Sequence, residues 1–457
     1  MVAGDDLPRG ATLRCSRESV RNGRWRHRMA GERRECGRLG QHLVRRAVLA
    51  AALIVGLLGG TLTPAAAART PLKPATFNPA DFAGVELPGD LGQVGFAVYV
   101  PKTKHSIRGY MLDYWRANGA ASVYGNPISE PFPSKDGRYS QAFENGIFQF
   151  YPELVWTDLP SIKLMPIGWP AMRARLDQMR PDGRRGGGGG DRRYAVWSWI
   201  PPDSKAAARA VAEGGRYVGE TGHTIRGAFA DWYDRHEGWA YLGNPLSQPV
   251  GERGVVVQYF EGALLMRLSD GSVRLAPLAR EMASELGIDT EPVAQGDLPV
   301  YDELLFWTMD NPNPLGDPYA PGRKWIEVNV SQQTLYAYQG DTLITQTLVS
   351  TGLAPNTTEL GVFHVRYKVP VTDMQGTTGP NGEVIAVGTE AQGGERYIVK
   401  DVPDVMYINA DAEALHGTYW HNNFGYPMSH GCINLPLDMA HFLYGWAPLG
   451  TMVWVHE

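Results

Sequence analysis

Two short segments near the end of the 457-residue chain hold the residue types that acyl transfer needs. The first is His416-Gly417-Thr418, and the second is Ser429-His430-Gly431-Cys432-Ile433-Asn434. Acyl transfer requires a thiolate, a base that generates it, and backbone donors for the oxyanion. Cys432, with His416 sixteen positions upstream and Gly431 beside it, supplies candidates for all three. The spacing therefore predicts a cysteine-nucleophile enzyme.

These segments resemble the signature of the YkuD-type L,D-transpeptidases. That family carries a histidine in a His-Gly pattern, a gap of this size, then Ser or Thr, His-Gly-Cys, any residue, and Asn or Arg. The likeness runs from residue 323 to residue 457 and includes Ser350-Thr351-Gly352 and Gly361-Val-Phe, although Glu359 replaces a usual proline. It implies a YkuD-type β-sandwich that acts on the stem peptides of bacterial peptidoglycan.

The resemblance implies a role for each residue of the motif. Cys432 is expected to be the nucleophile and His416 its general base, oriented by the backbone carbonyl of Gly417. The N–H groups around Gly431 and Cys432 are expected to form the oxyanion hole, while His430 either braces the loop or takes part in catalysis. The residues expected to hold the loop, line the pocket or contact substrate are Ser429, Asn434, Tyr407, Tyr419, Trp420 and His421.

The family mechanism implies that Cys432 attacks the carbonyl after the L-centre of a tetrapeptide stem, releases the terminal D-amino acid and holds an acyl-enzyme. An amine of a neighbouring stem then resolves this intermediate into a 3→3 cross-link, whereas water would give L,D-carboxypeptidase activity instead. No metal or organic cofactor is required. The resemblance also implies acylation of Cys432 by carbapenems, because they present a strained acyl group to the same thiol.

Two other functions compete with this interpretation. Zinc would accept His416, His421, His430 and Cys432 as ligands, but their spacing matches no common zinc pattern, and no second thiol or paired carboxylate accompanies them. Alternatively, the chain is a cell-wall-binding protein whose catalytic domain is vestigial. The intact motif argues against this second alternative.

The start of the chain has the order of a secretory signal. Residues 1–68 contain twelve Arg against five Asp or Glu, and Arg45-Arg46 precede the apolar stretch Ala47–Leu58. Small residues at Ala65–Ala68 provide a cleavage site, and the apolar stretch is short for an uncleaved membrane anchor. We expect cleavage near Ala68 and an exported protein, with Met29 as a later start that gives a more normal signal.

The part that remains after the leader is acidic and has a single thiol. It carries 31 Lys and Arg against 43 Asp and Glu, which disfavours a nucleic-acid partner because binding phosphates needs a basic face. Cys15 and Cys36 lie in the leader, so Cys432 can form no internal disulfide after export. Chemistry is a better reason than packing for a lone thiol outside the cytoplasm.

A duplication lies between the leader and the catalytic motif. His105-Ser-Ile-Arg-Gly recurs as His223-Thr-Ile-Arg-Gly, and Gly125-Asn-Pro recurs as Gly243-Asn-Pro, both at an offset of 118. Each copy predicts a short helix, a turn and a hairpin of short strands. The copies resemble LGFP-type repeats of bacterial surface proteins, which implies attachment to the envelope or to cell-wall glycan. For most of their aromatic residues, a place in the core is the simpler explanation.

The predicted organisation is a mainly β protein with two small α+β repeat units ahead of the catalytic domain. Its segments are a leader at 1–68, repeat unit 1 at 69–180, a Gly- and Arg-rich linker at 181–193, repeat unit 2 at 194–309, a linker at 310–322 and the catalytic domain at 323–457. In the last segment we predict strands from Trp325, Gln333 and Leu343, others at Gly361–Val369, Tyr397–Val399 and Met452–His456, and a helix at Leu437–Trp446.

Overall fold

The computed structural model describes residues 96–155, 157, 159–178, 197–252, 254–307, 314–388 and 393–457, all of which fall within one compact unit. The predicted leader at 1–68 and the linker at 181–193 lie outside them. Within these ranges, none of the helices is long and apolar enough to cross a membrane.

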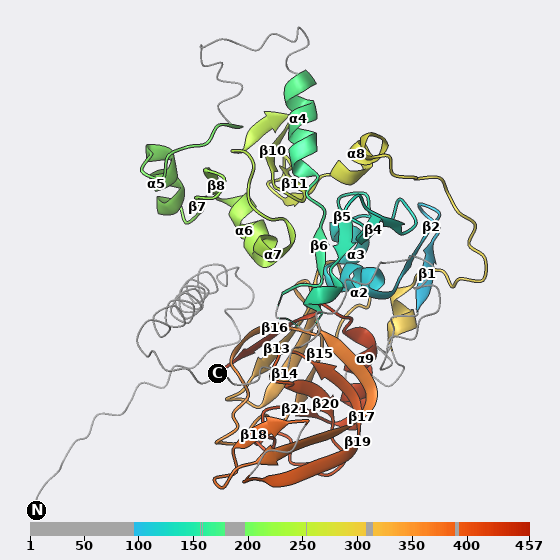
Figure 1. The fold of residues 1–457 in the computed structure, drawn as a ribbon, viewed down its shortest axis with the longest axis vertical. Coiled ribbons are helices and arrows are strands. Elements are labelled where there is room, and N and C mark those ends of the chain that lie inside the picture. Colours follow the sequence, from blue (N-terminus) through green and yellow to red (C-terminus); the bar gives the residue numbers. More distant parts are fainter. Residues whose placement is uncertain are drawn as a thin grey trace, which may run out of the picture. The chain divides into compact units, whose positions relative to one another are not determined.

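Repeat unit 1 starts with a hairpin and continues into two short helices and a meander of strands (Figure 1). Its elements are β1 (Ala97–Val100), β2 (His105–Arg108), α2 (Gly109–Ala117), α3 (Ala120–Val123), β3 (Phe132–Pro133), β4 (Tyr139–Ala142), β5 (Ile147–Phe150), β6 (Ile162–Leu164) and α4 (Gly168–Gln178). The helix, the turn and the hairpin that the sequence predicts are present as α2, residues 124–127 and β4–β5.

Repeat unit 2 has the same order of elements after an additional helix, α5 (Lys205–Ala212). They are β7 (Arg216–Val218), β8 (His223–Ile225), α6 (Ala228–Arg235), α7 (Gly238–Tyr241), β9 (Val250–Glu252), β10 (Val255–Tyr259), β11 (Leu264–Arg267), β12 (Val273–Leu275) and α8 (Leu278–Leu286). The strand orders β3-β4-β5-β6 and β9-β10-β11-β12 also correspond. The likeness to LGFP-type repeats remains a prediction.

Matching polar residues make matching bonds in the two units. Gln141 Nε2 donates to Ser129 O at 2.9 Å, and Gln258 Nε2 donates to Ser247 O at the same distance. Both glutamines are fully buried, so a lost partner would cost about 1–3 kcal/mol. The repeated polar residues therefore hold the turn onto the hairpin in each unit.

The terminal helices of the two units are exchanged. The N–H of Gly168, at the start of α4, donates to Glu261 O of unit 2 at 2.8 Å, while the N–H of Arg280 in α8 donates to Glu144 O of unit 1 at 3.1 Å. A Cβ at Gly168 would lie 1.8 Å from Phe260 O, so this approach requires glycine. Apolar residues of both helices and both meanders form one core cluster. The two predicted units thus share a hydrophobic core.

The residues after 323 form two sheets, with strand orders β15-β14-β13-β22-β16 and β18-β17-β19-β20-β21, drawn in orange and red in Figure 1. Apolar residues alternate along the first strands, so Ile326, Val328 and Leu335 are fully buried and share one core with Leu415 and Ile433 of the second sheet. The bounds are β13 (Lys324–Asn329), β14 (Thr334–Gln339), β15 (Thr342–Leu348), β16 (Gly361–His364), β17 (Tyr367–Thr378), β18 (Val384–Val387), β19 (Glu395–Tyr407), β20 (Ala414–Gly417), β21 (Ile433–Leu435) and β22 (Met452–His456).

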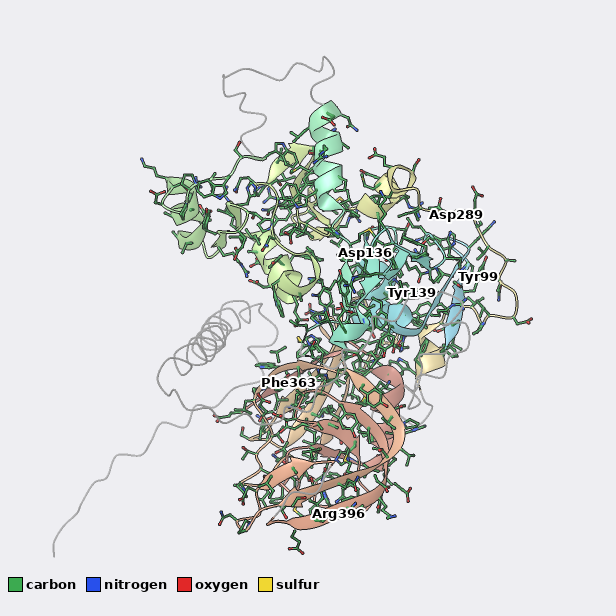
Figure 2. The ribbon with its side chains drawn as sticks, in the orientation of Figure 1. Tyr99, Asp136, Tyr139, Asp289, Phe363 and Arg396 are labelled. Atoms are coloured by element: carbon green, nitrogen blue, oxygen red, sulfur yellow. The ribbon has the colours of Figure 1, made fainter. Side chains whose placement is uncertain are left out.

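The sequence predicts the hairpin of this domain and its helix correctly, but not the second sheet. Helix α9 spans Leu437–Trp446 as predicted, and Gly340 takes the turn between β14 and β15 with φ +56°. The run Gly361–Val369 is instead divided between β16 and β17, and Tyr397–Val399 is a small part of β19. Near the start of β19, Arg396 extends from the end of the ribbon and donates to Gln375 Oε1 at 2.8 Å (Figure 2).

Helix α9 covers the second sheet, where it contacts β19 and β20. Phe442, Leu443 and Trp446 are fully buried, which anchors the helix in the core. At its C-terminus, the Lys368 ammonium donates to Ala447 O at 3.0 Å and also to Tyr444 O, so a cation meets the negative end of the helix dipole. This lysine is fully buried, and burial lowers its pKa to about 7 although the charge of Asp113 opposes the shift.

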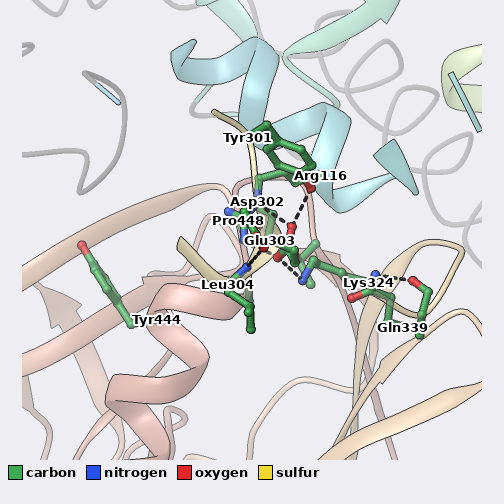
Figure 3. A network of polar contacts seen from close by, with 12 residues as sticks. Arg116, Tyr301, Asp302, Glu303, Leu304, Lys324, Gln339, Tyr444 and Pro448 are labelled. Atoms are coloured by element: carbon green, nitrogen blue, oxygen red, sulfur yellow. Dashed lines mark hydrogen bonds and ion pairs between the residues drawn. The ribbon is translucent and has the colours of Figure 1, made fainter. Parts of the chain in front are cut away.

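A buried ion cluster links α2 to the start of the catalytic domain (Figure 3). Glu303, in the 3₁₀ turn Glu303–Phe306, accepts two hydrogen bonds from Arg116, at 2.7 and 3.2 Å, and forms an ion pair with Lys324 Nζ at 2.8 Å. Tyr301 donates a further bond to it at 2.8 Å. Burial alone would raise the pKa of Glu303, but the charges of Arg116 and Lys324 outweigh burial and lower it to about 2.

Candidate active site

The pairing of two short strands brings the motif segments together. β20, which carries His416, runs parallel to β21, which begins directly after Cys432. In this register His416 lies opposite Asn434. Parallel strands need a long crossover, and residues 418–432 provide it here. The crossover also carries most of the remaining motif residues.

Cys432 is partly exposed and packs against a small apolar cluster of Val402, Val405 and Ala414. Burial, and then the negative charge of Glu413, raise the pKa of the thiol to about 11, although a backbone hydrogen bond with Ala414 acts in the opposite direction. The resting side chain is therefore a neutral thiol at neutral pH.

His416 is buried and is oriented by its neighbour. Its Nδ1 lies 3.1 Å from Gly417 O, and because a carbonyl only accepts, Nδ1 carries the proton and Nε2 is left as the acceptor. Burial lowers the pKa of His416 to about 4. The ring also stacks against Trp420, with centroids 5.7 Å apart. His416 is thus a neutral imidazole in the form that can take a proton.

The loop before Cys432 is held by its own hydroxyl. Ser429 Oγ donates to Cys432 O at 2.5 Å and accepts the N–H of Gly431 at 3.2 Å. Thr358 Oγ1 donates to Gly431 O at 2.7 Å, which fixes the other side of the same residue. Gly431 has φ +123°, a conformation that strongly favours glycine. The Gly431 N–H, predicted to serve the oxyanion hole, therefore bonds to Ser429 in this conformation.

The segment Ser350–Gly352 clamps both sides of the loop. Ser350 and Asn434 exchange backbone bonds of 3.0 and 2.9 Å, and the N–H of Ser429 donates to Thr351 O at 3.1 Å. The N–H of Gly352 donates to Thr358 Oγ1 at 2.9 Å. This segment is part of the sequence resemblance. Its hydrogen bonds fix the positions at which the loop begins and ends.

Two tyrosines of β19 lie close to the thiol. Burial, and then the charge of Cys432, raise the pKa of both Tyr397 and Tyr407. His430 is exposed and stacks on Tyr397, with ring centroids 5.1 Å apart. The sequence indicates Tyr407 as a site residue but does not indicate Tyr397. No local signal distinguishes Tyr397 from the other residues of its strand, where it pairs with Gly376 of β17.

His421 and Asn434 form a second polar pair. The N–H of Asn423 donates to His421 Nδ1 at 3.2 Å, so Nε2 carries the ring proton. That nitrogen lies 2.9 Å from the Asn434 amide nitrogen, while Asn434 Oδ1 is buried without a hydrogen-bond partner. If the Asn434 amide group is rotated by 180°, His421 Nε2 donates to Asn434 Oδ1, so the ring N–H and the amide oxygen both have a partner. Asn434 is thus held by the crossover segment.

Tyr419 and Trp420 are exposed and form the edge of the site. Their rings meet edge to face with centroids 5.0 Å apart, and the Tyr419 hydroxyl donates to Lys400 O at 2.6 Å. This bond ties the crossover to β19. An exposed aromatic pair beside a buried base suits a substrate that is bound at the surface.

Glu413 is a candidate that the sequence analysis does not identify. It lies three residues before His416, and its carboxylate accepts Asn409 Nδ2 at 2.9 Å and the N–H of Glu359 at 3.1 Å. Burial, and to a smaller extent the charges of Glu359 and Asp411, raise its pKa to about 7, although its hydrogen bonds act in the opposite direction. The sequence signal that could have identified Glu413 is an acidic residue directly before a buried strand.

The four residues that would ligate zinc are not gathered into a metal site. In the part of the chain that the structure describes, no group of three or more His, Cys, Asp or Glu side chains could hold a metal ion. His421 faces Asn434, and His430 stacks on Tyr397.

One protein family matches the C-terminal domain. The YkuD family, described as the L,D-transpeptidase catalytic domain, matches residues 323–455. No curated protein matches the chain.

Several solved structures also match. A catalytic domain of an E. faecium L,D-transpeptidase acylated by ertapenem is 26% identical over 29% of this chain and 96% of that one, with a TM-score of 0.24. The L,D-transpeptidase LdtMt1 in complex with imipenem is 19% identical over 29% of this chain and only 58% of that one, with the same TM-score. An L,D-transpeptidase from Mycobacterium smegmatis is 15% identical over 59% and 87%, at 0.25. At these TM-scores none of the three establishes the fold of the whole chain.

Proposed function

We propose that residues 323–455, which match the L,D-transpeptidase catalytic domain, act on peptidoglycan stem peptides through an acyl-enzyme on Cys432. The observation that carries the proposal is the parallel pairing of β20 with β21. His416 lies in β20, and Cys432 directly precedes the paired strand β21, so this pairing supports a neutral imidazole and a thiol acting together within the matched domain.

The resting pair is uncharged, so the proton moves as the bond forms. His416 Nε2 takes the thiol proton while Cys432 Sγ attacks the carbonyl carbon that follows the L-centre of a tetrapeptide stem. The carbonyl oxygen becomes an oxyanion, which backbone N–H groups stabilise. The C–N bond then breaks, and the terminal D-amino acid leaves with the proton held by His416. The product is a thioester on Cys432.

Transfer reverses these proton movements. An amine of a neighbouring stem attacks the thioester carbon and gives its proton to His416, the new C–N bond forms and the C–S bond breaks. Cys432 leaves as a thiolate and recovers the proton from His416. If water attacks instead, the product is a shortened stem, as in an L,D-carboxypeptidase. The structure favours neither acceptor over the other.

Work on peptidoglycan requires the domain to lie outside the cytoplasm. The signal-like order of residues 1–68 supports export, and the lone thiol of the remainder is consistent with it. The two repeat units, which share one hydrophobic core, are the candidate module for binding cell-wall glycan. Export and glycan binding both stand as parts of this proposal.

The proposal is tested by the intact mass of the protein after incubation with a disaccharide-tetrapeptide and, separately, with a carbapenem. We expect an adduct on the wild type, but none on Cys432→Ala. Cross-linked dimer in solution establishes transfer, and tripeptide alone establishes hydrolysis. If neither reagent modifies Cys432 nor changes the substrate, the enzymatic function is wrong and the repeat units become the functional part.

A further inference from the structure

We propose that Glu413 is a positioning residue for Cys432, whose carboxylate braces the nucleophile loop at Gly431 and sets a negative charge beside the thiol. This inference rests on the proposed role of Cys432 as the nucleophile. It concerns the reactivity of the thiol before any substrate binds, so it can be tested without turnover.

The brace is a close contact between the carboxylate and the loop. A Cβ built on Gly431 would lie 2.9 Å from Glu413 Oε1 and 3.5 Å from its Cγ, so Glu413 occupies the space that a side chain at Gly431 would need. Thr358 Oγ1 donates a hydrogen bond to the carbonyl oxygen of Gly431. Together they leave the residue before Cys432 little freedom to move.

Glu413 is itself held by two loops from other parts of the sequence. Asn409 closes a small ring with it, because Asn409 Nδ2 donates to the carboxylate at 2.9 Å and Asn409 Oδ1 accepts the Glu413 N–H at 2.9 Å. The N–H of Glu359 donates to both carboxylate oxygens, at 3.1 and 3.3 Å. Proline has no N–H, so this second bond exists only because position 359 is not the proline found in the resembling family.

The charged groups around the pair are all carboxylates. Glu359 and Asp411 face Glu413, and Glu413 itself faces Cys432, whereas Tyr397 and Tyr407, which also face Cys432, are uncharged because burial raises the pKa of both. His416, the nearby base, is neutral. An ionised Glu413 therefore disfavours a second negative charge on Cys432, and no cation among these groups offsets it. Neutralising Glu413 should lower the pKa of the thiol.

The test is the rate at which iodoacetamide alkylates Cys432 between pH 6 and 10 in the full chain, read by mass spectrometry on the peptide that contains this cysteine. Glu413→Gln keeps an acceptor for the Glu359 N–H but removes the charge. We expect its alkylation at pH 8 to be about threefold to tenfold faster than in the wild type, as follows from a shift of about one pKa unit partly offset by a less nucleophilic thiolate. Its profile should also lose the flattening near pH 7 that the titration of Glu413 gives the wild type.

Two further variants distinguish the effect of the Glu413 charge from the effect of its contact with the loop. Asp411→Asn removes an exposed charge that does not touch Gly431, and its profile should stay within a factor of two of the wild type. Glu359→Pro removes the N–H donor and leaves the Glu413 charge less stabilised, so it should shift the profile in the same direction as Glu413→Gln by a smaller amount. An unchanged profile for Glu413→Gln, in a variant with wild-type circular dichroism, overturns the inference. Failure of carbapenem acylation in the wild type would instead refute the proposed function and leave this result standing.

Discussion

Two buried polar clusters in this protein show opposite electrostatic behaviour. In one, burial is the largest influence on His416 and Cys432 and makes both neutral at pH 7, and the charge of Glu413 acts on Cys432 in the same direction. In the other, Arg116, Glu303 and Lys324 are also buried, yet Glu303 remains ionised because two cations contact it. Burial favours the uncharged form of a titratable group, whereas an oppositely charged neighbour favours its ionised form.

The difference separates the requirements of catalysis from those of assembly. A neutral base and a neutral thiol can exchange a proton when a substrate arrives, whereas in the ion cluster the two cations keep Glu303 ionised at neutral pH. The ion cluster contributes to the stability of the fold. Removing one member lowers this stability, because it leaves the other charged groups buried without a partner. Each cluster can be perturbed separately, and the expected effects cover a wide range.

The largest effect is expected from the catalytic base. His416→Ala removes the group that takes the thiol proton, so acylation of Cys432 by a carbapenem should slow by about 10²- to 10⁴-fold at pH 7. The melting temperature should change little in comparison. Stopped-flow absorbance of the carbapenem measures the rate, and His441→Ala, which replaces an exposed histidine of α9, is the matched control. A rate within threefold of the wild type would exclude His416 as the base.

Glu303→Ala should destabilise the fold by about 3–5 kcal/mol, because it leaves Arg116 and Lys324 buried and uncompensated. Urea unfolding monitored by circular dichroism measures the change. Glu285→Ala, an exposed glutamate of α8, is the control and should lie within about 0.5 kcal/mol of the wild type. Equal midpoints for the two variants would mean that the cluster contributes no stability.

The pH dependence of acylation should separate the two clusters. His416 has a lowered pKa of about 4, so it remains an unprotonated base in mildly acidic solution and the rate should halve only near pH 4. Glu303 has a folded-state pKa below its unfolded value of about 4.5, so its contribution to stability is complete above pH 4.5 and is lost as the pH falls toward 2. Most of that contribution therefore survives at pH 4. A midpoint near 6.5 in the carbapenem rate profile would show an ordinary, solvated histidine.

The smallest effect is expected at an ion pair on the surface. Arg209 Nε lies 2.6 Å from Glu213 Oε1, one turn apart on α5, and both side chains are exposed. Solvent screens such a pair, so Arg209→Ala should leave the melting temperature unchanged within error, as measured by differential scanning fluorimetry. A clear loss of stability would show that distance alone, without burial, determines what an ion pair contributes in this protein.

The sequence predicts those parts of the fold that local patterns specify. Alternating residues around Gly340-Asp341 predict the β14–β15 hairpin, and the apolar run after Pro436 predicts α9. The motif spacing selects His416 and Cys432; in the structure His416 lies in β20 and Cys432 directly precedes the neighbouring strand β21. In each case a short stretch of chain contains the whole signal.

The parts that the sequence does not predict depend on distant segments. β17 contains Pro370 and several polar residues, so its strand character comes from pairing with β19 and not from its own pattern. β20 and β21 are too short for a periodic signal. Tyr397 lies in the part of β19 that pairs with β17, and nothing in its own segment indicates that it lies close to the thiol.

The reciprocal exchange of α4 and α8 has the form of an isologous dimer interface built within one chain. A single copy of the repeat unit would leave its terminal helix without a partner, and its apolar residues would be satisfied only by a second molecule. Joining two copies in one polypeptide replaces this concentration-dependent association with an intramolecular one. The duplicated region therefore stays paired however dilute the protein becomes, as a covalent homodimer would.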